Sequence, residues 1–199
     1  MLLVSRSAVP YHHGNLAEEL ERAGLELIEN GGHANLSLRE VARRAGVSHN
    51  APYHHFGDRA TLLKRLAELS MAALLDAQRA AITGGGSSVD TAVAMGLAYV
   101  TWATQHPGGF AVIYDPEVCE PGNPTPHMAE LIAANERLLA ESVAAIATDA
   151  SPEQLEALAV AAWGTVQGLS QLASAGHLPV GALEPALRAV FDSFSPQAG

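Results

Sequence analysis

Two short helical patterns on either side of one glycine constrain the fold of this chain more than any other feature of its sequence. Ser37 and Glu40 match a capping box, in which the serine accepts from the Glu40 backbone N–H and the carboxylate reaches back. A helix over residues 38–45 should follow, and Gly46 can take the left-handed backbone that ends it. Residues 48–56, with their first serine as the cap, form a second short helical pattern. Two short helices joined by such a turn predict a helix-turn-helix.

Amphipathic helical patterns continue through the rest of the chain, which is rich in alanine and leucine and has no segment of period-two alternation. Besides the helix-turn-helix, helices are predicted at 15–31, 59–82, 89–105, 110–114, 127–148, 152–174 and 183–194. Glycine- and proline-rich segments should separate them at 84–88, 106–109 and 116–126, the last as a surface loop. With 199 residues, 48% of them hydrophobic, the chain can bury a substantial core, so these helices predict an all-α fold.

Charge is distributed unevenly along the chain. The formal net charge is -10, but residues 1–65 hold eight basic and seven acidic residues, whereas residues 66–199 hold three basic and fourteen acidic ones. Because cationic side chains supply most non-specific affinity for DNA, the net charge argues against a nucleic-acid partner and the local distribution argues for one. The basic residues within 33–65 are Arg39, Arg43, Arg44, Arg59, Lys64 and Arg65. Only Glu40 and Asp58 oppose them, so this segment is a candidate phosphate-facing surface.

The sequence shows none of the residue groups that enzymes and metal proteins require. No nucleophile–base pair or metal-ligand set stands out, so we expect no catalytic residues, no metal and no cofactor. His12 and His13 lack accompanying ligands, and a capping or DNA-proximal role suits them better than metal binding. Cys119 is the only cysteine, and no apolar run is long enough for a signal peptide or a membrane span. We therefore expect a cytoplasmic protein without a membrane partner.

The second short helix is too polar to serve only as core. Its first turn presents Ser48, His49 and Asn50, whose donors and acceptors suit base edges. Ala51 is small enough to meet a thymine methyl. The candidate DNA-binding residues are Ser37, Arg43, Arg44, Ser48, His49, Asn50, Ala51, Tyr53, His54, His55 and Arg59. A purely structural helical hairpin is the alternative, and salt-dependent DNA affinity would distinguish the two.

The same segment resembles the TetR family of transcription regulators. The resemblance rests on Leu-Ser-Leu-Arg-Glu-Val-Ala at 36–42, Ala-Gly-Val-Ser at 45–48, Tyr-His-His-Phe at 53–56 and Asp-Arg-Ala-Thr-Leu-Leu at 58–63. It is strong over about 15–64 and extends farther only through the number and order of the helices. It implies a tail and helix-turn-helix domain at 1–58 and a helical ligand-binding and dimerisation domain at 59–199. A homodimeric repressor, released from a palindromic operator by a small molecule, is the implied function.

Other residues resemble the TetR subgroup that carries a Trp-His-Gly motif in its C-terminal domain. They are Tyr-His-His-Gly-Asn-Leu at 11–16, Ala-Pro-Tyr at 51–53, and Trp163 followed by Gly168. Gln167 stands where the subgroup places its histidine, so the role of that histidine does not carry over. Arg59 replaces the family's commoner lysine and could hold a phosphate through two parallel hydrogen bonds.

The C-terminal helices contain residues suited to an effector cavity. The candidate ligand-binding residues are Tyr99, Trp102, Phe110, Tyr114, Met128, Trp163 and Gln167, although any one of the aromatic or apolar ones, taken alone, is more often plain core. An aromatic and aliphatic lining predicts a mostly apolar ligand with few hydrogen-bonding groups. The helix at 59–82 begins beside the phosphate-facing surface and ends near the cavity, so we expect it to act as the lever between ligand and DNA.

A dimer is expected because one short recognition helix reads too few base pairs for specificity. Two-fold pairing would place two such helices about 34–36 Å apart on a palindrome. Small residues in 152–174 permit close helix approach, either in internal packing or in a dimer seam. We expect a seam in which they meet an apolar stripe of the last helix in a four-helix arrangement. That stripe consists of Leu183, Leu187, Val190 and Phe191.

Overall fold

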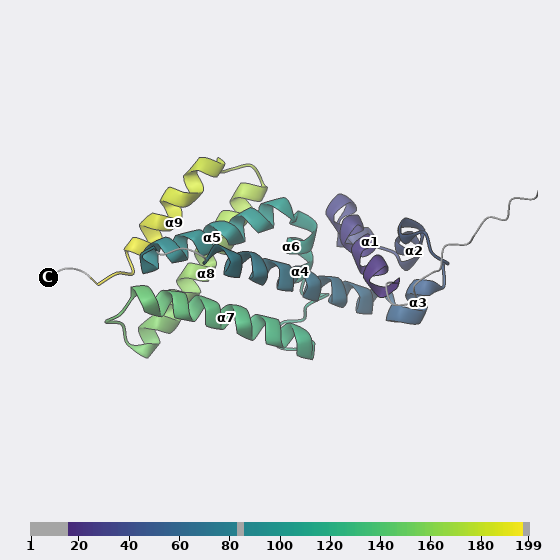
Figure 1. Cartoon of the computed structure of the whole chain (residues 1–199), viewed down its shortest axis with the longest axis horizontal. Helices are drawn as coiled ribbons and strands as arrows, with labels where there is room; N and C mark the ends of the chain where they lie inside the picture. The colour runs from purple at the N-terminus through teal and green to yellow at the C-terminus, as the bar shows by residue number, and fades with distance from the viewer. Residues whose placement is uncertain (1–15, 83–85, 197–199) are drawn as a thin grey trace, which may run out of the picture.

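The computed structural model describes residues 16–82 and 86–196. Within these ranges all regular structure is helical, which confirms the predicted all-α fold and its nine α-helices (Figure 1). The helices are α1 (Leu16–Gly31), α2 (Leu38–Ala45), α3 (Ala51–Phe56), α4 (Arg59–Ala81), α5 (Ser88–Gln105), α6 (Pro107–Ile113), α7 (Pro126–Ile146), α8 (Pro152–Ser174) and α9 (Leu183–Asp192). Short 3-10 turns η1 (His33–Asn35) and η2 (Val180–Ala182) precede α2 and α9. None of the helices in the described ranges is long and apolar enough to cross a membrane.

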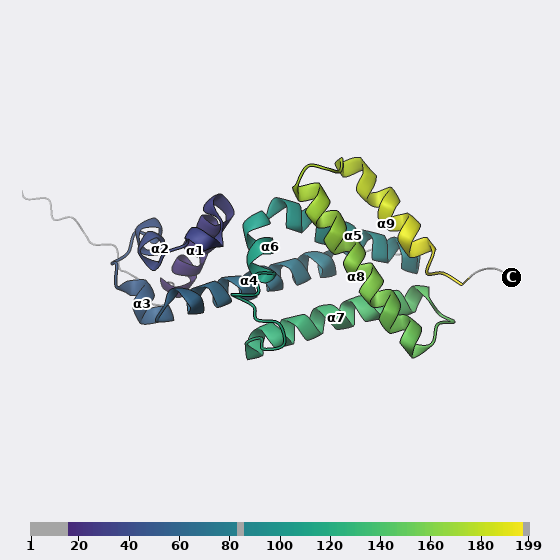
Figure 2. The ribbon, with the colours of Figure 1, turned by 180° about the vertical axis from the view of Figure 1, so that it is seen from behind.

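The first three helices form a small unit, here called the head, at one end of the molecule (Figures 1 and 2). Leu20 and Ile28 of α1 are buried in one hydrophobic cluster with Leu38 and Val41 of α2. Each of these side chains is at most 4% exposed. Both helices therefore bury an apolar stripe against each other and leave their charged sides to solvent.

The caps of α2 follow the sequence pattern only in part. Ser37 Oγ accepts a hydrogen bond from the Glu40 backbone N–H at 3.2 Å, as predicted. The second predicted hydrogen bond of the capping box, from the Ser37 backbone N–H to the Glu40 carboxylate, is wrong. That carboxylate pairs instead with Arg43 on its own helix. Gly46 has φ 69° and ψ 27°, the left-handed conformation that ends α2 where a side chain would be strained.

Helix α3 begins two residues later than predicted, because Asn50 and not Ser48 occupies the position before its first residue. Ser48 does not cap it, and residues 48–50 form the turn instead. No side chain of the described residues caps the start of the helix, and Pro52 occupies its first turn, where a missing N–H costs no hydrogen bond. The recognition helix is therefore only six residues long.

Helix α4 runs from the head into the body, the unit formed by α4–α9 (Figures 1 and 2). Asp58 Oδ1 accepts from the Thr61 N–H at 2.8 Å and so caps the helix at its start. Leu62, Leu66 and Leu74 are fully buried, which confirms the inward stripe expected for this segment. The stripe packs against α5, α6 and α7, so one continuous helix connects the head to most of the body.

Helix α9 packs on α5 of its own chain. Leu183, Leu187 and Phe191 are at most 3% exposed, and a Cβ at Gly96 of α5 would lie 3.1 Å from Leu187. The expectation that this stripe forms the dimer seam is wrong, because the intramolecular core already uses it. Sequence periodicity identified the buried face of α9 but not the helix that covers it.

The proline- and glycine-rich segments also differ from expectation. Residues 106–109 were predicted as a stop, yet α6 begins at Pro107, so the Pro-Gly-Gly run forms its first turn. Most of the loop 116–125 is exposed as predicted, but its Val118 is buried at 8% exposure. Residues 106–109 can start a helix because the first helical position tolerates proline. The loop contributes to the packing because the apolar side chain of Val118 inserts between its neighbours.

Candidate DNA interface and effector site

The turn before α3 and the outer side of α3 form a polar surface on the head. Its hydroxyl, amide and imidazole groups can donate and accept hydrogen bonds, as contacts with base edges require. All of its side chains are exposed, and that of Tyr53 is 47% exposed. We call this surface the α3 face, and it consists of Ser48, His49, Asn50, Tyr53, His54 and His55.

Ala51 and Pro52 lie on the opposite side of the same helical turn. Both are buried, and Ala51 is only 9% exposed. The expectation that Ala51 meets a thymine methyl is wrong, because the Ala51 side chain packs into the head. The shift in the start of α3 explains the change, since it places these two residues on the inner side of the first turn.

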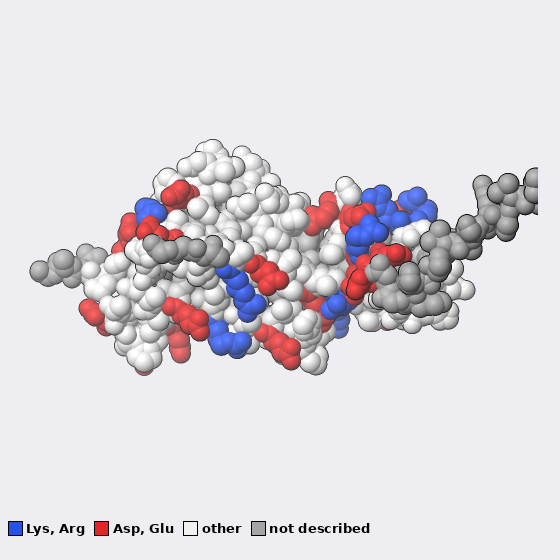
Figure 3. Space-filling view, in the orientation of Figure 1, with Lys and Arg blue, Asp and Glu red and all other residues white. Residues whose placement is uncertain are grey.

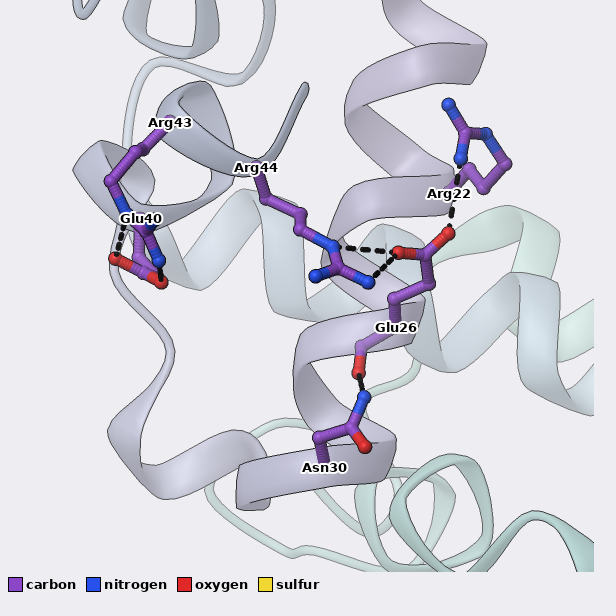
Figure 4. A network of polar contacts seen from close by, with 6 residues as sticks. All are labelled: Arg22, Glu26, Asn30, Glu40, Arg43 and Arg44. Atoms are coloured by element: carbon purple, nitrogen blue, oxygen red, sulfur yellow. Dashed lines mark hydrogen bonds and ion pairs between the residues drawn. The ribbon is translucent and has the colours of Figure 1, made fainter. Parts of the chain in front are cut away.

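Basic side chains gather over the end of the molecule that carries α1 and α2 (Figure 3). Several are paired within the head: Arg44 Nε donates to Glu26 at 2.7 Å, and Arg22 donates to the same carboxylate at 3.0 Å (Figure 4). Hydrogen bonds from Arg44 lower the pKa of Glu26, and those from Arg43 lower the pKa of Glu40. The Arg43 and Arg44 side chains are 69% and 50% exposed, so phosphates can compete for them.

Arg59 has a structural role that its sequence position did not suggest. Its Nε donates to the Leu36 carbonyl at 2.8 Å, and its Nη2 donates to the carbonyls of His33 and Ala34 at 2.7 and 2.9 Å. The predicted two-pronged phosphate contact is therefore wrong in its geometry, because this fork holds the connection between α1 and α2. Nothing local marks this role, since the three carbonyls lie more than 20 residues away in sequence.

Arg39 of α2 and Lys64 of α4 are exposed cations whose charge is not taken up by an ion pair in the described part of the chain. Arg65, by contrast, donates to Glu21 at 2.7 Å. Arg39 belongs to the predicted phosphate-facing surface, although the predicted set of DNA-binding residues did not include it.

Tyr99 stands at the centre of a polar cluster inside the body. Its hydroxyl lies 2.6 Å from the Tyr114 hydroxyl and donates to Gln167 Oε1 at 2.7 Å. The Phe110 ring meets the Tyr99 ring edge-on at a centroid distance of 5.8 Å. Burial raises the pKa of Tyr99, so its hydroxyl stays protonated and remains a hydrogen-bond donor. The structure thus brings four of the predicted ligand-binding residues together.

A small cavity of about 20 Å³ lies beside this cluster, between α4, α5, α7, α8 and α9. Trp163, which is 44% exposed, lines the cavity and also reaches the surface. The lining residues are Gln78, Met95, Gly96, Tyr99, Asn135, Leu139, Trp163, Val166 and Phe191. The sequence did not point to Gln78 or Asn135, because a single polar residue in a long helix is usually exposed.

Trp102 and Met128 lie apart from this cavity. The Trp102 ring packs against His106 at a centroid distance of 5.1 Å, near the start of α6. Met128 borders a separate cavity of about 10 Å³ together with Cys119 and Lys64. The expectation that both line the same site as Tyr99 is wrong, because Trp102 packs near the start of α6 and Met128, in the first turn of α7, borders the second cavity.

A contact between α1 and α6 joins the head to the body at a second place. The Glu29 carboxylate accepts from the backbone N–H groups of Gly108 and Gly109, each at 2.9 Å. These N–H groups start α6 and have no partner within the helix. A Cβ at Gly108 would lie 2.3 Å from the Ile28 carbonyl oxygen, so only glycine permits this approach.

A second pair reinforces the same contact. His33 Nε2 lies 2.5 Å from Asp115 Oδ2, and this hydrogen bond is the main cause of a lowered pKa for Asp115. Sequence reasoning missed this contact, because its members are about 80 residues apart and match no local motif. We call it the head–body clamp, and it consists of Glu29, His33, Gly108, Gly109 and Asp115.

One side of α8 is exposed and largely apolar. Val160 and Leu172 are 66% and 45% exposed, and Trp163 lies beside them on the same helix. A Cβ added at Gly164 or Gly168 would meet nothing within 4 Å. We call this surface the outer face of α8, and it consists of Val160, Trp163, Gly164, Gly168 and Leu172.

The N-terminal His12 and His13 lie outside the described residues.

Two family models match the chain. Residues 21–66 match the bacterial regulatory proteins of the tetR family, and residues 92–194 match the tetracyclin repressor-like C-terminal domain. The first match contains the α3 face and most of the head, and the second contains Tyr99, Trp163 and Gln167. No curated protein matches the chain.

Solved structures share the fold over nearly the whole chain. A protein of unknown function from Rhodococcus sp. RHA1 is 32% identical, with a TM-score of 0.82 over 96% of this chain and 100% of that chain. A tetR-family regulatory protein from Rhodococcus RHA1 is 24% identical, with a TM-score of 0.67 over 88% and 96%. FadR from Bacillus subtilis in complex with stearoyl-CoA is 13% identical, with a TM-score of 0.69 over 89% and 98%. The chain therefore belongs to the TetR family, whose members are DNA-binding transcription regulators and not enzymes.

Proposed function

We propose that this protein is a homodimeric repressor that binds a palindromic operator through its α3 face and leaves it when a small, mostly apolar ligand enters the body. The α3 face carries the proposal. Sequence-specific contacts need exposed donors and acceptors on a rigid element. Here six such side chains project from one short helix and its turn, while Ala51 and Pro52 anchor that helix from behind. The Arg43, Arg44 and Arg39 side chains would contact flanking phosphates.

The outer face of α8 supports pairing with a second copy of the chain. Exposed Val160, Trp163 and Leu172 give the face apolar area, and Gly164 and Gly168 allow a second helix to approach closely. A symmetric pair of α8 helices would bury the same residues on both copies. With the apolar stripe of α9 already covered by α5, we assign the main seam to α8.

Ligand binding would reach the head by two routes. Helix α4 begins at Arg59 beside the head and carries Gln78 into the cavity. Helix α6 starts at the head–body clamp, and its Phe110 contacts Tyr99 beside the same cavity. A ligand that widens the cavity would displace both helices and alter the spacing of the two α3 helices. Release requires that the ligand bind the altered arrangement more tightly than the operator-bound one.

Selection of bound duplexes from a random pool tests the proposal directly. We expect a palindrome with half-sites about one helical turn apart, and two chains per duplex in sedimentation. His54→Ala on the α3 face should lower affinity for the selected duplex, whereas His127→Ala, an exposed histidine on α7, should not. A pool without enrichment, or a duplex bound equally by both variants and the wild type, would contradict it.

A further inference from the structure

Gln78 and Asn135 form a polar pair at the cavity. Gln78 is only 5% exposed, and its Nε2 donates to Asn135 Oδ1 at 2.9 Å and to the Leu74 carbonyl at 3.4 Å. A buried primary amide costs free energy that hydrogen bonds only partly recover, and two apolar side chains of similar size would avoid this cost. Stability alone therefore does not account for an amide pair between α4 and α7.

Other uncharged polar groups line the cavity or lie on the same side of α7. Tyr99, with its bond to Gln167, lines the same cavity from α5. Ser142 follows Asn135 by seven residues on α7, hence on the same side of the helix. Its Oγ is buried and has no hydrogen-bond partner in the part of the chain that the structure describes. The inner side of the body thus offers several hydrogen-bonding groups among apolar ones.

Among the residues that the structure describes, no charged side chain lines the cavity. Cations are also few in the remainder of the chain, since residues 66–199 contain only three basic residues, and one of them, Arg137, is exposed on α7. Arg188 donates to Asp90 at 2.8 Å, and Arg79 pairs with Asp76 at 3.7 Å, both on the surface. An ion moved into such a cavity would lose its hydration without gaining a counter-charge. The lining therefore disfavours carboxylates and phosphates as well as ammonium groups.

We propose that the effector is an uncharged molecule whose carbonyl, amide or hydroxyl group takes over the hydrogen bonds that Gln78 and Asn135 make to each other. Its apolar part lies among Met95, Leu139 and Phe191. This inference rests on the proposed function and adds the chemical class of the ligand and the residues that orient it.

The size of the cavity gives the amide pair a further role. About 20 Å³ holds roughly one water, whereas small-molecule sites measure about 300–1,000 Å³. Binding must therefore move α7 away from α4, which breaks the bond between Gln78 and Asn135. A polar group on the ligand replaces that bond, so the body opens at lower cost for an uncharged polar ligand than for a hydrocarbon or an ion.

Matched probes of different charge test the inference. The probes are octanamide and cyclohexanecarboxamide, the corresponding carboxylates, and octylammonium and cyclohexylmethylammonium. Binding is measured by thermal shift and by tryptophan fluorescence in a Trp102→Phe variant, in which Trp163 at the cavity is the only tryptophan. We expect the amides to bind at least about tenfold more tightly than either charged series. Equal or tighter binding of a charged probe, or no binding by any probe, would overturn the inference.

A double variant separates the ligand assignment from the proposed function. Gln78→Met with Asn135→Leu replaces both amides, so no unpaired polar group remains and the fold should persist. We expect amide binding to fall about tenfold while affinity for the selected operator stays within twofold of wild type. Gln105→Met, on an exposed residue of α5, is the matched control. Unchanged amide binding in the double variant would overturn the inference even if the operator is bound, and absence of any operator would overturn only the proposed function.

Discussion

Glu29 shows how one side chain can fix the position of a helix in another part of the molecule. Its carboxylate supplies acceptors for two N–H groups that α6 leaves unpaired at its start. The approach requires a glycine at position 108, because the Ile28 carbonyl occupies the space that a Cβ would need. The position of the head relative to the body thus depends on single residues in each, Glu29 in the head and Gly108 in the body.

Gly108→Ala should destabilise the protein. A methyl 2.3 Å from a backbone oxygen forces α1 and α6 apart, and overpacking of this kind costs about 1–3 kcal/mol. Thermal unfolding should show a lower Tm than wild type. Gly31→Ala is the control, because a Cβ there meets nothing within 4 Å. Equal Tm values for Gly108→Ala and wild type would show that α1 and α6 do not meet as described.

The ion pair of Asp90 and Arg188 should make stability depend on pH in the acid range. The hydrogen bond from Arg188, followed by those from Ser87, lowers the pKa of Asp90 to about 2. A carboxyl whose folded pKa lies below its unfolded value near 3.9 stabilises the fold above about pH 4 and loses this effect as pH falls toward 2. The Tm difference between wild type and Asp90→Asn should therefore be constant at neutral pH and shrink between pH 4 and 2. A Tm difference at pH 2 as large as the one at neutral pH would contradict this assignment.

Some residue-level features of the site could be predicted from sequence, and others could not. The exposure of Asn50 and His54 follows from local polarity, because a polar turn beside an apolar stripe faces solvent. The roles of Arg59 and Ala51 depended on tertiary structure. Arg59 binds carbonyls of a distant turn, and Ala51 lies on the inner side because α3 starts two residues later than predicted.

At the scale of elements, helix bounds were predictable wherever local chemistry fixed them. Helix α8 spans 152–174 as predicted, because Ser151 and Gln154 form its capping box and a proline occupies its first position. Which helices pack together was not predictable, since an amphipathic stripe fits many apolar surfaces. The stripe of α9 was assigned to a dimer seam and lies on α5 instead.

A charge on the outer face of α8 should break the dimer. Val160 is 66% exposed in the single chain, so Val160→Glu should leave the fold intact and place a carboxylate in the proposed seam. Analytical ultracentrifugation should show monomers for this variant. Ala144→Glu, on an exposed residue of α7, should remain dimeric as the control. A dimeric Val160→Glu protein would place the seam on another surface.

At the scale of the whole molecule, the head is held to the body at two places. Helix α4 is continuous between them, and the head–body clamp joins α1 and the turn after it to α6 and the loop that follows. Two attachments restrict the orientation of the head more than one helix could. A head held in this way presents its α3 face at a defined angle, which a fixed spacing of two half-sites requires.

Glu29→Ala should loosen this attachment. The Gly108 and Gly109 N–H groups lose their acceptor, so hydrogen exchange should accelerate at residues 108–110. Affinity for the selected operator should also fall, because the head samples more orientations. Glu18→Ala, an exposed residue of α1, should change neither quantity. Unchanged exchange at 108–110 in Glu29→Ala would show that the clamp does not hold α6.

The salt dependence of operator binding tests most directly the claim that this head binds DNA through its α3 face and the cations around it. Arg39→Ala should weaken binding to all duplexes about equally and reduce the slope of log K against log salt by about 0.9 for one lost phosphate contact. Asn50→Ala should leave the slope unchanged and relax the preference at one base position by about 1–3 kcal/mol. Binding that does not vary with salt, or the same uniform loss of affinity in both variants, would contradict the account.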